Sequence, residues 1–317
     1  MQNIISITDM RDTFFEEIFN YCKKKNDLFI VSIDYGSPFL DKFRKRFKNQ
    51  FINVGISEQA GVSYASGLAK QGFKVILYSI NSFIIYRALE QIKLDLSYNN
   101  NPITILGVGP GYAYEVAGPT HHSTEDISVQ LNIPNLRLFS PCDCNTIKYL
   151  SKKIIYSKKQ HLNYIRLERG KTINYAINQM DINRGYREVI KGKKNIIFSY
   201  GNLVPVIYNY IQKLVLNFPK EKNNFHLVDL FELKKIYSKK ILNILKNFEN
   251  CFVYEEQNEN GGISNILAKI ILKNKININF NNFSIPDKSI YQNSTRTNIY
   301  KKLNFDYKSF EKNIIYY

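Results

Sequence analysis

Short apolar runs rich in β-branched residues alternate with helical patterns along the first half of the chain. The runs cover residues 28–33, 74–79, 102–109, 135–141 and 162–168. Helical patterns cover residues 9–24, 57–71, 83–97 and 143–157. In the first of these, Met10, Phe14, Ile18 and Cys22 recur every fourth residue and form one apolar face. Because the strands are apolar on both faces, the alternation predicts a parallel β-sheet covered by helices.

The pattern is interrupted at residues 171–185, which are polar and show no clear period. It then resumes with apolar runs and helical patterns. The runs are residues 195–201, 225–231 and 251–256, and the helical patterns are residues 204–216, 238–248 and 262–273. We therefore expect an α/β domain over residues 1–172 and a smaller α/β domain over residues 186–317. The Asn-rich segment after residue 273 has no readable pattern.

Composition is that of an ordinary globular protein, with 44% hydrophobic and 22% charged residues. No apolar run approaches the roughly 20 residues of a membrane helix. The first residues lack a basic stretch followed by an apolar one. We expect a cytoplasmic protein that does not bind membranes. Its four cysteines have neither zinc-site nor redox-pair spacing, and we expect them to be reduced.

The formal charge of +17 raises the question of nucleic-acid binding. The lysines are scattered, however, and the one dense stretch, residues 41–48, is explained by a solvated helix face. Lys, Asn, Ile, Tyr and Phe are abundant and Trp is absent, which indicates A/T-rich codons. We expect no nucleic-acid partner, because nothing beyond charge supports one.

A long Gly-rich loop follows the run at residues 102–109, where ligands of α/β sheets bind. Gly107, Gly109 and Gly111 have G-x-G-x-G spacing, which fits neither a dinucleotide fingerprint nor a Walker loop. Four residues of this loop are potential metal ligands by type: His121, His122, Glu125 and Asp126. Their spacing matches no known metal cage. Histidines that hydrogen-bond a substrate are the favoured interpretation, with no metal site.

Glu58 is a lone carboxylate in the stretch FINVGISEQAGVSYASGLAKQGF, residues 51–73. It falls in the first turn of a predicted helix, where the helix dipole favours a carboxylate. Small residues surround it: Gly55, Ala60, Gly61, Ala65, Ser66, Gly67 and Ala69. Such a surface allows another helix to approach closely. A carboxylate buried there can hold a proton and share it with a ring nitrogen.

Several stretches resemble one family. FINVGISEQ (51–59), SINSFIIYRALEQI (79–92) and AGPTHHSTEDI (117–127) resemble the pyrimidine-binding domain of transketolases, 1-deoxyxylulose-5-phosphate synthase and the beta chains of 2-oxoacid dehydrogenases. FVYEEQNENGGISN (252–265) and FSIPDK (283–288) resemble their C-terminal domain. The resemblance covers nearly the whole chain in order. It implies a thiamine-diphosphate-binding fold followed by a smaller α/β transketolase C-terminal domain.

The resemblance also implies roles for individual residues. The family binds thiamine diphosphate, and Glu58 matches the catalytic glutamate that contacts N1′ of its aminopyrimidine ring. Other matches to cofactor-binding positions are Asp34, Ile80, Phe83 and Tyr86. His121 matches a histidine that contacts substrate hydroxyls and is expected to be catalytic. Arg169 matches an arginine that binds a substrate phosphate.

Departures from the family pattern bear on the substrate. Ile80 stands where a ring-stacking phenylalanine is usual. Gly109 replaces a histidine and Ala117 an aspartate, both of which touch the sugar in the family. No G-D-G magnesium motif occurs in these 317 residues. We therefore expect an N-terminal transketolase subunit as partner, which holds the diphosphate and most of the Mg²⁺ contacts, in an α2β2 assembly where this chain self-associates.

The function implied is the C-terminal subunit of a two-subunit transketolase-like enzyme. It would transfer a two-carbon ketol unit from a ketose phosphate to an aldose, which the departures suggest is non-standard. One alternative is a synthase or decarboxylating subunit acting on a 2-oxoacid. Another is a non-catalytic scaffold of the same fold, against which the presence of Glu58 argues.

Overall fold

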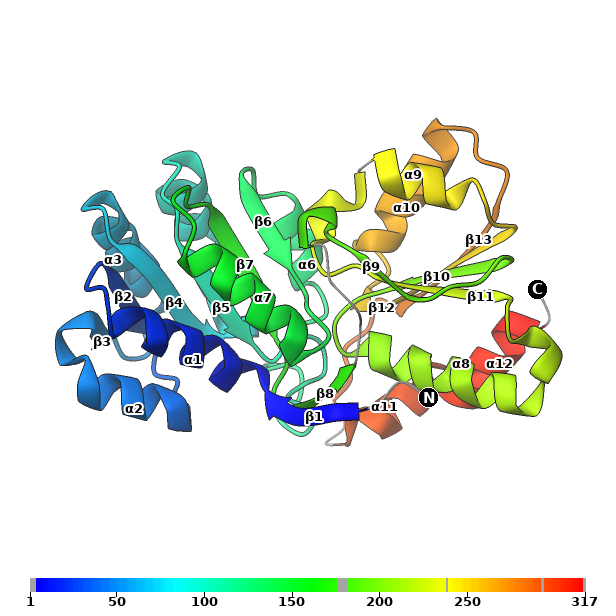
Figure 1. Ribbon diagram of the computed structural model, residues 1–317, viewed down its shortest axis with the longest axis horizontal. Helices are drawn as coiled ribbons and strands as arrows, with labels where there is room; N and C mark the ends of the chain where they lie inside the picture. Colours follow the sequence, from blue (N-terminus) through cyan, green and yellow to red (C-terminus); the bar gives the residue numbers. More distant parts are fainter. Residues whose placement is uncertain (1–3, 176–181, 238, 292–293, 316–317) are drawn as a thin grey trace. The chain divides into compact units, whose positions relative to one another are not determined.

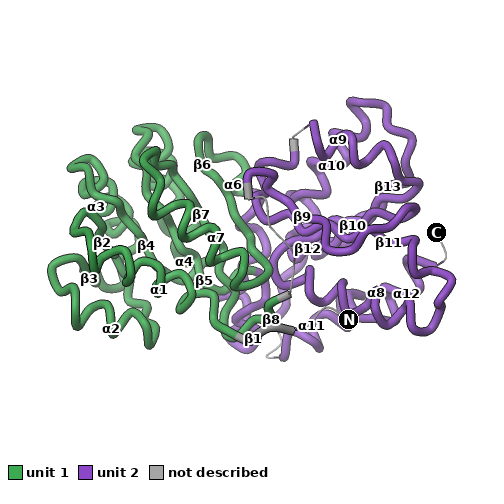
Figure 2. Tube along the Cα trace, viewed as in Figure 1, with its two compact units in different colours: residues 1–110, 129–178 green, residues 111–128, 179–317 purple. Residues whose placement is uncertain are grey.

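The computed structural model describes residues 4–175, 182–237, 239–291 and 294–315. These form two compact units (Figure 2): residues 1–110 with 129–178, and residues 111–128 with 179–317. The loop at residues 111–128 thus clusters with the second unit. The domain boundaries expected at residues 172 and 186 stay predictions. Among the described residues, no helix is both long and apolar enough to cross a bilayer, and the cytoplasmic location also stays a prediction.

The first unit is built on a six-stranded parallel sheet in the order β3-β2-β4-β5-β7-β6. The strands are β2 (Leu28–Ser32), β3 (Phe51–Asn53), β4 (Lys74–Ile80), β5 (Thr104–Val108), β6 (Leu136–Phe139) and β7 (Leu162–Leu167). Every residue of β5 and β7 is buried, so both faces of the sheet are covered. The predicted parallel α/β fold is confirmed.

Two groups of helices cover this sheet (Figure 1). One comprises α1 (Met10–Cys22), α2 (Pro38–Arg46) and α7 (Cys144–Ile155), and the other comprises α3 (Glu58–Lys70), α4 (Asn81–Arg87), α5 (Leu89–Gln91) and the π-helical segment η2 (Ile92–Tyr98). A short helix, α6 (Asp126–Leu131), precedes β6. The single helix expected over residues 83–97 is therefore three helical segments in sequence.

A small antiparallel pair also belongs to the first unit. It joins β1 (Ile4–Asp9) to β8 (Lys171–Tyr175), with Asp9 opposite Lys171 and Ile4 opposite Tyr175. The sequence predicted neither strand. Residues 171–175 lie in the segment that was expected to be an irregular break, and their pairing partner is more than 160 positions away, where no local pattern reveals it.

The second unit has a mixed sheet in the order β13-β12-β10-β11-β9, in which β9 is antiparallel. Its strands are β9 (Arg187–Ile190), β10 (Asn195–Ser199), β11 (Phe225–Asp229), β12 (Asn250–Asn258) and β13 (Asn279–Ile285). Its helices are α8 (Leu203–Asn217), α9 (Lys239–Leu245), α10 (Ile263–Lys273), α11 (Arg296–Lys302) and α12 (Tyr307–Ile315). Figure 1 shows α9 and α10 on one side of this sheet and α8, α11 and α12 on the other.

The Asn-rich tail thus completes the second unit. Its strand β13 pairs with β12, and the ring of Phe283 stacks on Tyr254 with centroids 4.4 Å apart.

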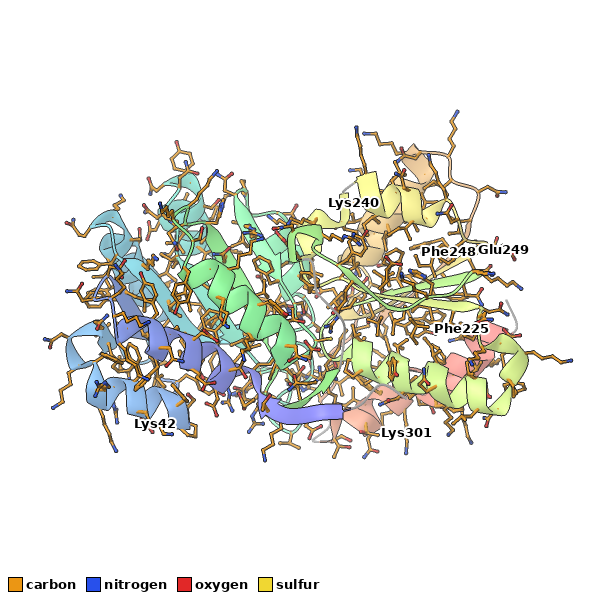
Figure 3. The ribbon with its side chains drawn as sticks, viewed as in Figure 1. Lys42, Phe225, Lys240, Phe248, Glu249 and Lys301 are labelled. Carbon is orange, nitrogen blue, oxygen red and sulfur yellow. The ribbon has the colours of Figure 1, made fainter. Side chains whose placement is uncertain are left out.

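Figure 3 labels lysines on three different helices: Lys42 on α2, Lys240 on α9 and Lys301 on α11. All three are exposed. The dense basic stretch on α2 is a solvated helix face, as the sequence indicated.

Candidate functional site

The expected cofactor and substrate residues of the first unit lie after successive strands of its sheet. Asp34 follows β2, Glu58 follows β3, Ile80 ends β4 and Arg169 follows β7. Since all six strands are parallel, these positions share the carboxyl edge of one sheet. The sheet topology therefore brings residues that are 135 positions apart in sequence to one edge of the fold.

Glu58 is the first residue of α3, and a tight turn delivers it there. Gly55 has a φ of +73°, a conformation that glycine adopts without strain. The Asn53 side-chain oxygen accepts hydrogen bonds from the backbone N–H of Gly55, at 3.0 Å, and of Asp34, at 3.1 Å. The turn thereby ties the end of β3 to the end of β2.

The Glu58 carboxylate is buried, with its side chain only 7% exposed. It lines a cleft of about 500 Å³. The other lining residues are Ile56, Ser57, Gln59, Ala60 and Arg87. The carboxylate therefore lies at the wall of a space that can accommodate a bound group.

Arg87, at the end of α4, is the partner of Glu58. Its Nη1 donates to Glu58 Oε1 at 2.7 Å, and its guanidinium lies 4.0 Å from the ring centre of Phe83. Arg87 was not among the predicted site residues, although it lies in the stretch that carries the resemblance. The available signal was its spacing, four residues after Phe83 on one helix face.

Several large apolar side chains on the elements next to Glu58 are exposed. Ile56, beside Glu58, is 75% exposed, and Tyr64, Tyr86 and Leu94 are each at least 40% exposed. They come from α3, α4, η2 and the turn before α3, which pack together. Exposed apolar groups on elements that pack together are typical of a surface that a partner covers. The small-residue face of α3 is partly open as well, since Ala60 and Gly67 are exposed.

His121 belongs to the second unit, on the loop of residues 111–128. Its backbone N–H donates to Gly118 O at 3.0 Å, and its Nδ1 lies 2.9 Å from Thr120 Oγ1. The adjacent His122 is buried, and burial lowers its pKa below the ordinary value of 6.5. His121 is the more accessible of the two, which agrees with its expected role toward a substrate.

The loop that carries His121 is anchored by charged groups from β12 and α11. Arg296 Nε donates to Glu256 Oε1 at 2.8 Å, its Nη2 donates to the other oxygen, and its backbone N–H donates to Glu115 on the loop. Tyr300 also donates to Glu256, at 2.8 Å. Gly111 lies against the Glu256 carboxylate, where any Cβ would clash. This anchor was not predicted from the sequence, because Arg296 lies in the Asn-rich segment that has no readable pattern.

Two further expectations concern Arg169 and metals. Arg169 is exposed, and its backbone N–H donates to Glu168 Oε1 at 3.2 Å. Within the described ranges, no group of three or more His, Cys, Asp and Glu side chains is placed to hold a metal ion. His121, His122, Glu125 and Asp126 therefore do not form such a group.

Comparison with known families accounts for both halves of the chain. Residues 7–173 match the pyrimidine binding domain of transketolase, and residues 185–309 match the transketolase C-terminal domain. The chain belongs to the transketolase family. The predicted family, its dependence on thiamine diphosphate and the transketolase-type transferase activity are confirmed at this level.

Individual relatives of this transketolase chain differ in length. One subunit of the apulose-4-phosphate transketolase of Phocaeicola vulgatus is 28% identical over 288 residues, which are 88% of each chain. The 1-deoxy-D-xylulose-5-phosphate synthase of Blochmanniella pennsylvanica is 29% identical over 285 residues, but only 42% of the synthase is covered.

Solved structures show the same fold. A split-gene transketolase, described as an inactive beta4 tetramer, has a TM-score of 0.80 with 19% identity, and 97% of both chains is covered. Transketolase of Campylobacter jejuni has a TM-score of 0.79 with 17% identity, and the match covers 98% of this chain and 47% of that one.

Proposed function

We propose that this chain is the pyrimidine-binding, C-terminal subunit of a two-subunit transketolase. It transfers a two-carbon ketol unit from a ketose phosphate to an aldose. The observation that carries the proposal is the Glu58 carboxylate, buried at the carboxyl edge of the parallel sheet and lining a cleft. A degenerate scaffold has no need for a buried carboxylate at the wall of an otherwise mostly uncharged cleft.

The residues present fit the aminopyrimidine end of thiamine diphosphate. Bound there, the cofactor supplies the nucleophilic carbon of its thiazolium ring, which proteins do not possess. Glu58 holds and shares the proton of the ring nitrogen N1′, while Ile80, Phe83 and Tyr86 line the slot and exclude water. Ile80 and Phe83 are half-buried, as the walls of a slot closed by a ligand would be. Asp34 is expected nearby, after β2.

The diphosphate and Mg²⁺ belong, on this proposal, to a partner subunit. Two relatives, each named as one subunit of an apulose-4-phosphate transketolase, come from Phocaeicola vulgatus and Actinobacillus succinogenes and match this chain over 88% and 81% of their length. The exposed apolar groups on α3, α4, η2 and the turn before α3 suit a surface that another polypeptide covers. We expect an α2β2 assembly in which this chain also contacts its own copy, active in the cytoplasm.

Sugar phosphates are the proposed substrates. His121 hydrogen-bonds the substrate hydroxyls, and Arg169 binds the phosphate through its planar guanidinium. Gly109 and Ala117 remove polar side chains from positions that touch the sugar in the family, which favours a modified or longer acceptor. The relatives named for apulose 4-phosphate agree with a sugar outside the common pentoses.

A 2-oxoacid synthase is the second candidate, because 1-deoxy-D-xylulose-5-phosphate synthases are also among the relatives. The choice of donor separates the two. The chain should be combined with its partner subunit, thiamine diphosphate and Mg²⁺, and supplied with either a ketose phosphate or pyruvate. Cofactor-dependent turnover of the ketose supports the proposal. Turnover of pyruvate alone would replace it with the synthase, and no turnover with either donor would favour the scaffold.

A further inference from the structure

Arg87 contacts two of the residues that the proposed function assigns to the aminopyrimidine ring, Phe83 and Glu58. Its guanidinium lies 4.0 Å from the centre of the Phe83 ring and donates to Glu58 Oε1 at 2.7 Å. The stack on Phe83 restricts the guanidinium plane, since such cation–π contacts have a preferred geometry. One side chain therefore links the aromatic wall of the slot to its carboxylate.

Arg87 is the only hydrogen-bond partner of the Glu58 carboxylate in the part of the chain that the structure describes. Within that part, Oε1 accepts this bond and Oε2 accepts none. Because the Glu58 side chain is 7% exposed, removing Arg87 would leave a buried carboxylate without a counter-charge. Such a group tends to rotate toward water, and this would move Oε2 away from a ring nitrogen bound in the slot.

We propose that Arg87 is the positioning residue of Glu58. It holds Oε1 in place, which leaves Oε2 to share a proton with the ring nitrogen N1′. This inference rests on the proposed function, because it assumes that Glu58 faces the aminopyrimidine. The opposite role is that Arg87 blocks the slot, since a planar N–H donor stacked on Phe83 imitates the ring itself. The half-exposed side chain, 47% accessible, favours positioning, because a blocking group would fill the slot.

The test compares thiamine diphosphate with an analogue that carries C–H in place of N1′. Binding of each is measured by calorimetry on this chain assembled with its partner subunit and Mg²⁺. The variants are Arg87→Gln, Arg87→Lys and Glu58→Gln. A matched control is Arg46→Gln on α2, because Arg46 is also exposed and lies 5.7 Å from a phenylalanine ring, that of Phe47.

We expect the wild-type assembly to bind the cofactor at least tenfold more tightly than the analogue, on the scale of about one charged hydrogen bond. Arg87→Gln should lose most of this preference, because the substitution weakens binding of the cofactor and leaves binding of the analogue unchanged. Arg87→Lys should recover part of it, since lysine keeps the charge without the planar stack. Arg46→Gln should keep the full preference.

The results that would contradict the proposed function differ from those that would contradict only the role of Arg87. If the wild type and Glu58→Gln both bind the two compounds equally, Glu58 does not face N1′, and the proposed function of this site falls together with the role of Arg87. A second outcome is that the wild type prefers the cofactor and Arg87→Gln keeps the same preference, or binds both compounds more weakly by the same factor. In that case only the positioning role of Arg87 is wrong. Tighter cofactor binding by Arg87→Gln would instead establish the blocking role.

Discussion

Replacing Glu58 with glutamine should abolish most activity and leave the fold intact. Glutamine has nearly the same size, but it cannot share a proton with N1′. The loss of one positioned proton donor reduces turnover about 10²-fold or more. The stability effect should be small, below about 1 kcal/mol, because the partner Arg87 is 47% exposed and water screens the pair.

The assay is steady-state ketol transfer by the assembled enzyme at saturating thiamine diphosphate. The free energy of unfolding is measured on the same preparations. Glu90→Gln is the matched control, since it makes the same chemical change on an exposed residue of the neighbouring helix α5. Near-normal turnover of a folded Glu58→Gln enzyme at saturating cofactor would refute the reasoning. A variant that unfolds would show that the carboxylate is structural instead.

Four further outcomes are expected. Arg296→Met should lower the free energy of unfolding by about 3–5 kcal/mol, because Glu256, 8% exposed, loses its counter-charge; urea unfolding measures this, and an unchanged midpoint would contradict it. Burial lowers the pKa of His226 below 6.5, so the unfolded chain binds the proton more readily and stability should fall as the pH drops below about 6.5. The free energy of unfolding of His226→Gln should change less steeply with pH in this range. The same pH dependence as the wild type would show that His226 is not its source. The chain alone should bind thiamine diphosphate with Mg²⁺ only weakly by calorimetry, and tight binding without a partner would exclude the two-subunit proposal. Ribose 5-phosphate should be a poor acceptor in a panel of aldoses tested with one ketose phosphate donor. If it proves the best acceptor, Gly109 and Ala117 do not alter the specificity for the sugar.

The sequence predicted the elements whose pattern is local. Apolar runs such as residues 74–79 and 162–168 became β4 and β7, and periodic stretches such as residues 57–71 became α3. The position of Glu58 at the start of that helix was also predictable, because a glycine turn and a short strand precede it. These features depend on residues within one or two turns of each other, which is the range that hydrophobic periodicity reports.

What the sequence could not provide depends on distant residues. The partner of Glu58 is 29 positions away on another helix, and the contact between Arg296 and Glu115 spans 181 positions. Neither has a spacing signature. The loop at residues 111–128 was expected in the first domain, whereas its contacts cluster with the second unit. Its neighbours there, Glu256 and Arg296, are supplied by segments far along the chain.

The pairing of β1 with β8 has a consequence for synthesis of the chain on the ribosome. Residue 4 lies opposite residue 175, so the first strand emerges long before its partner exists. At about 5–20 residues per second, roughly 10–30 seconds pass before β8 is made. Throughout that interval the backbone of β1 is an unpaired strand edge, open to pairing with other nascent chains. Slow translation between the codons of β1 and those of β8 should therefore increase aggregation, and early binding of a chaperone to β1 should reduce it.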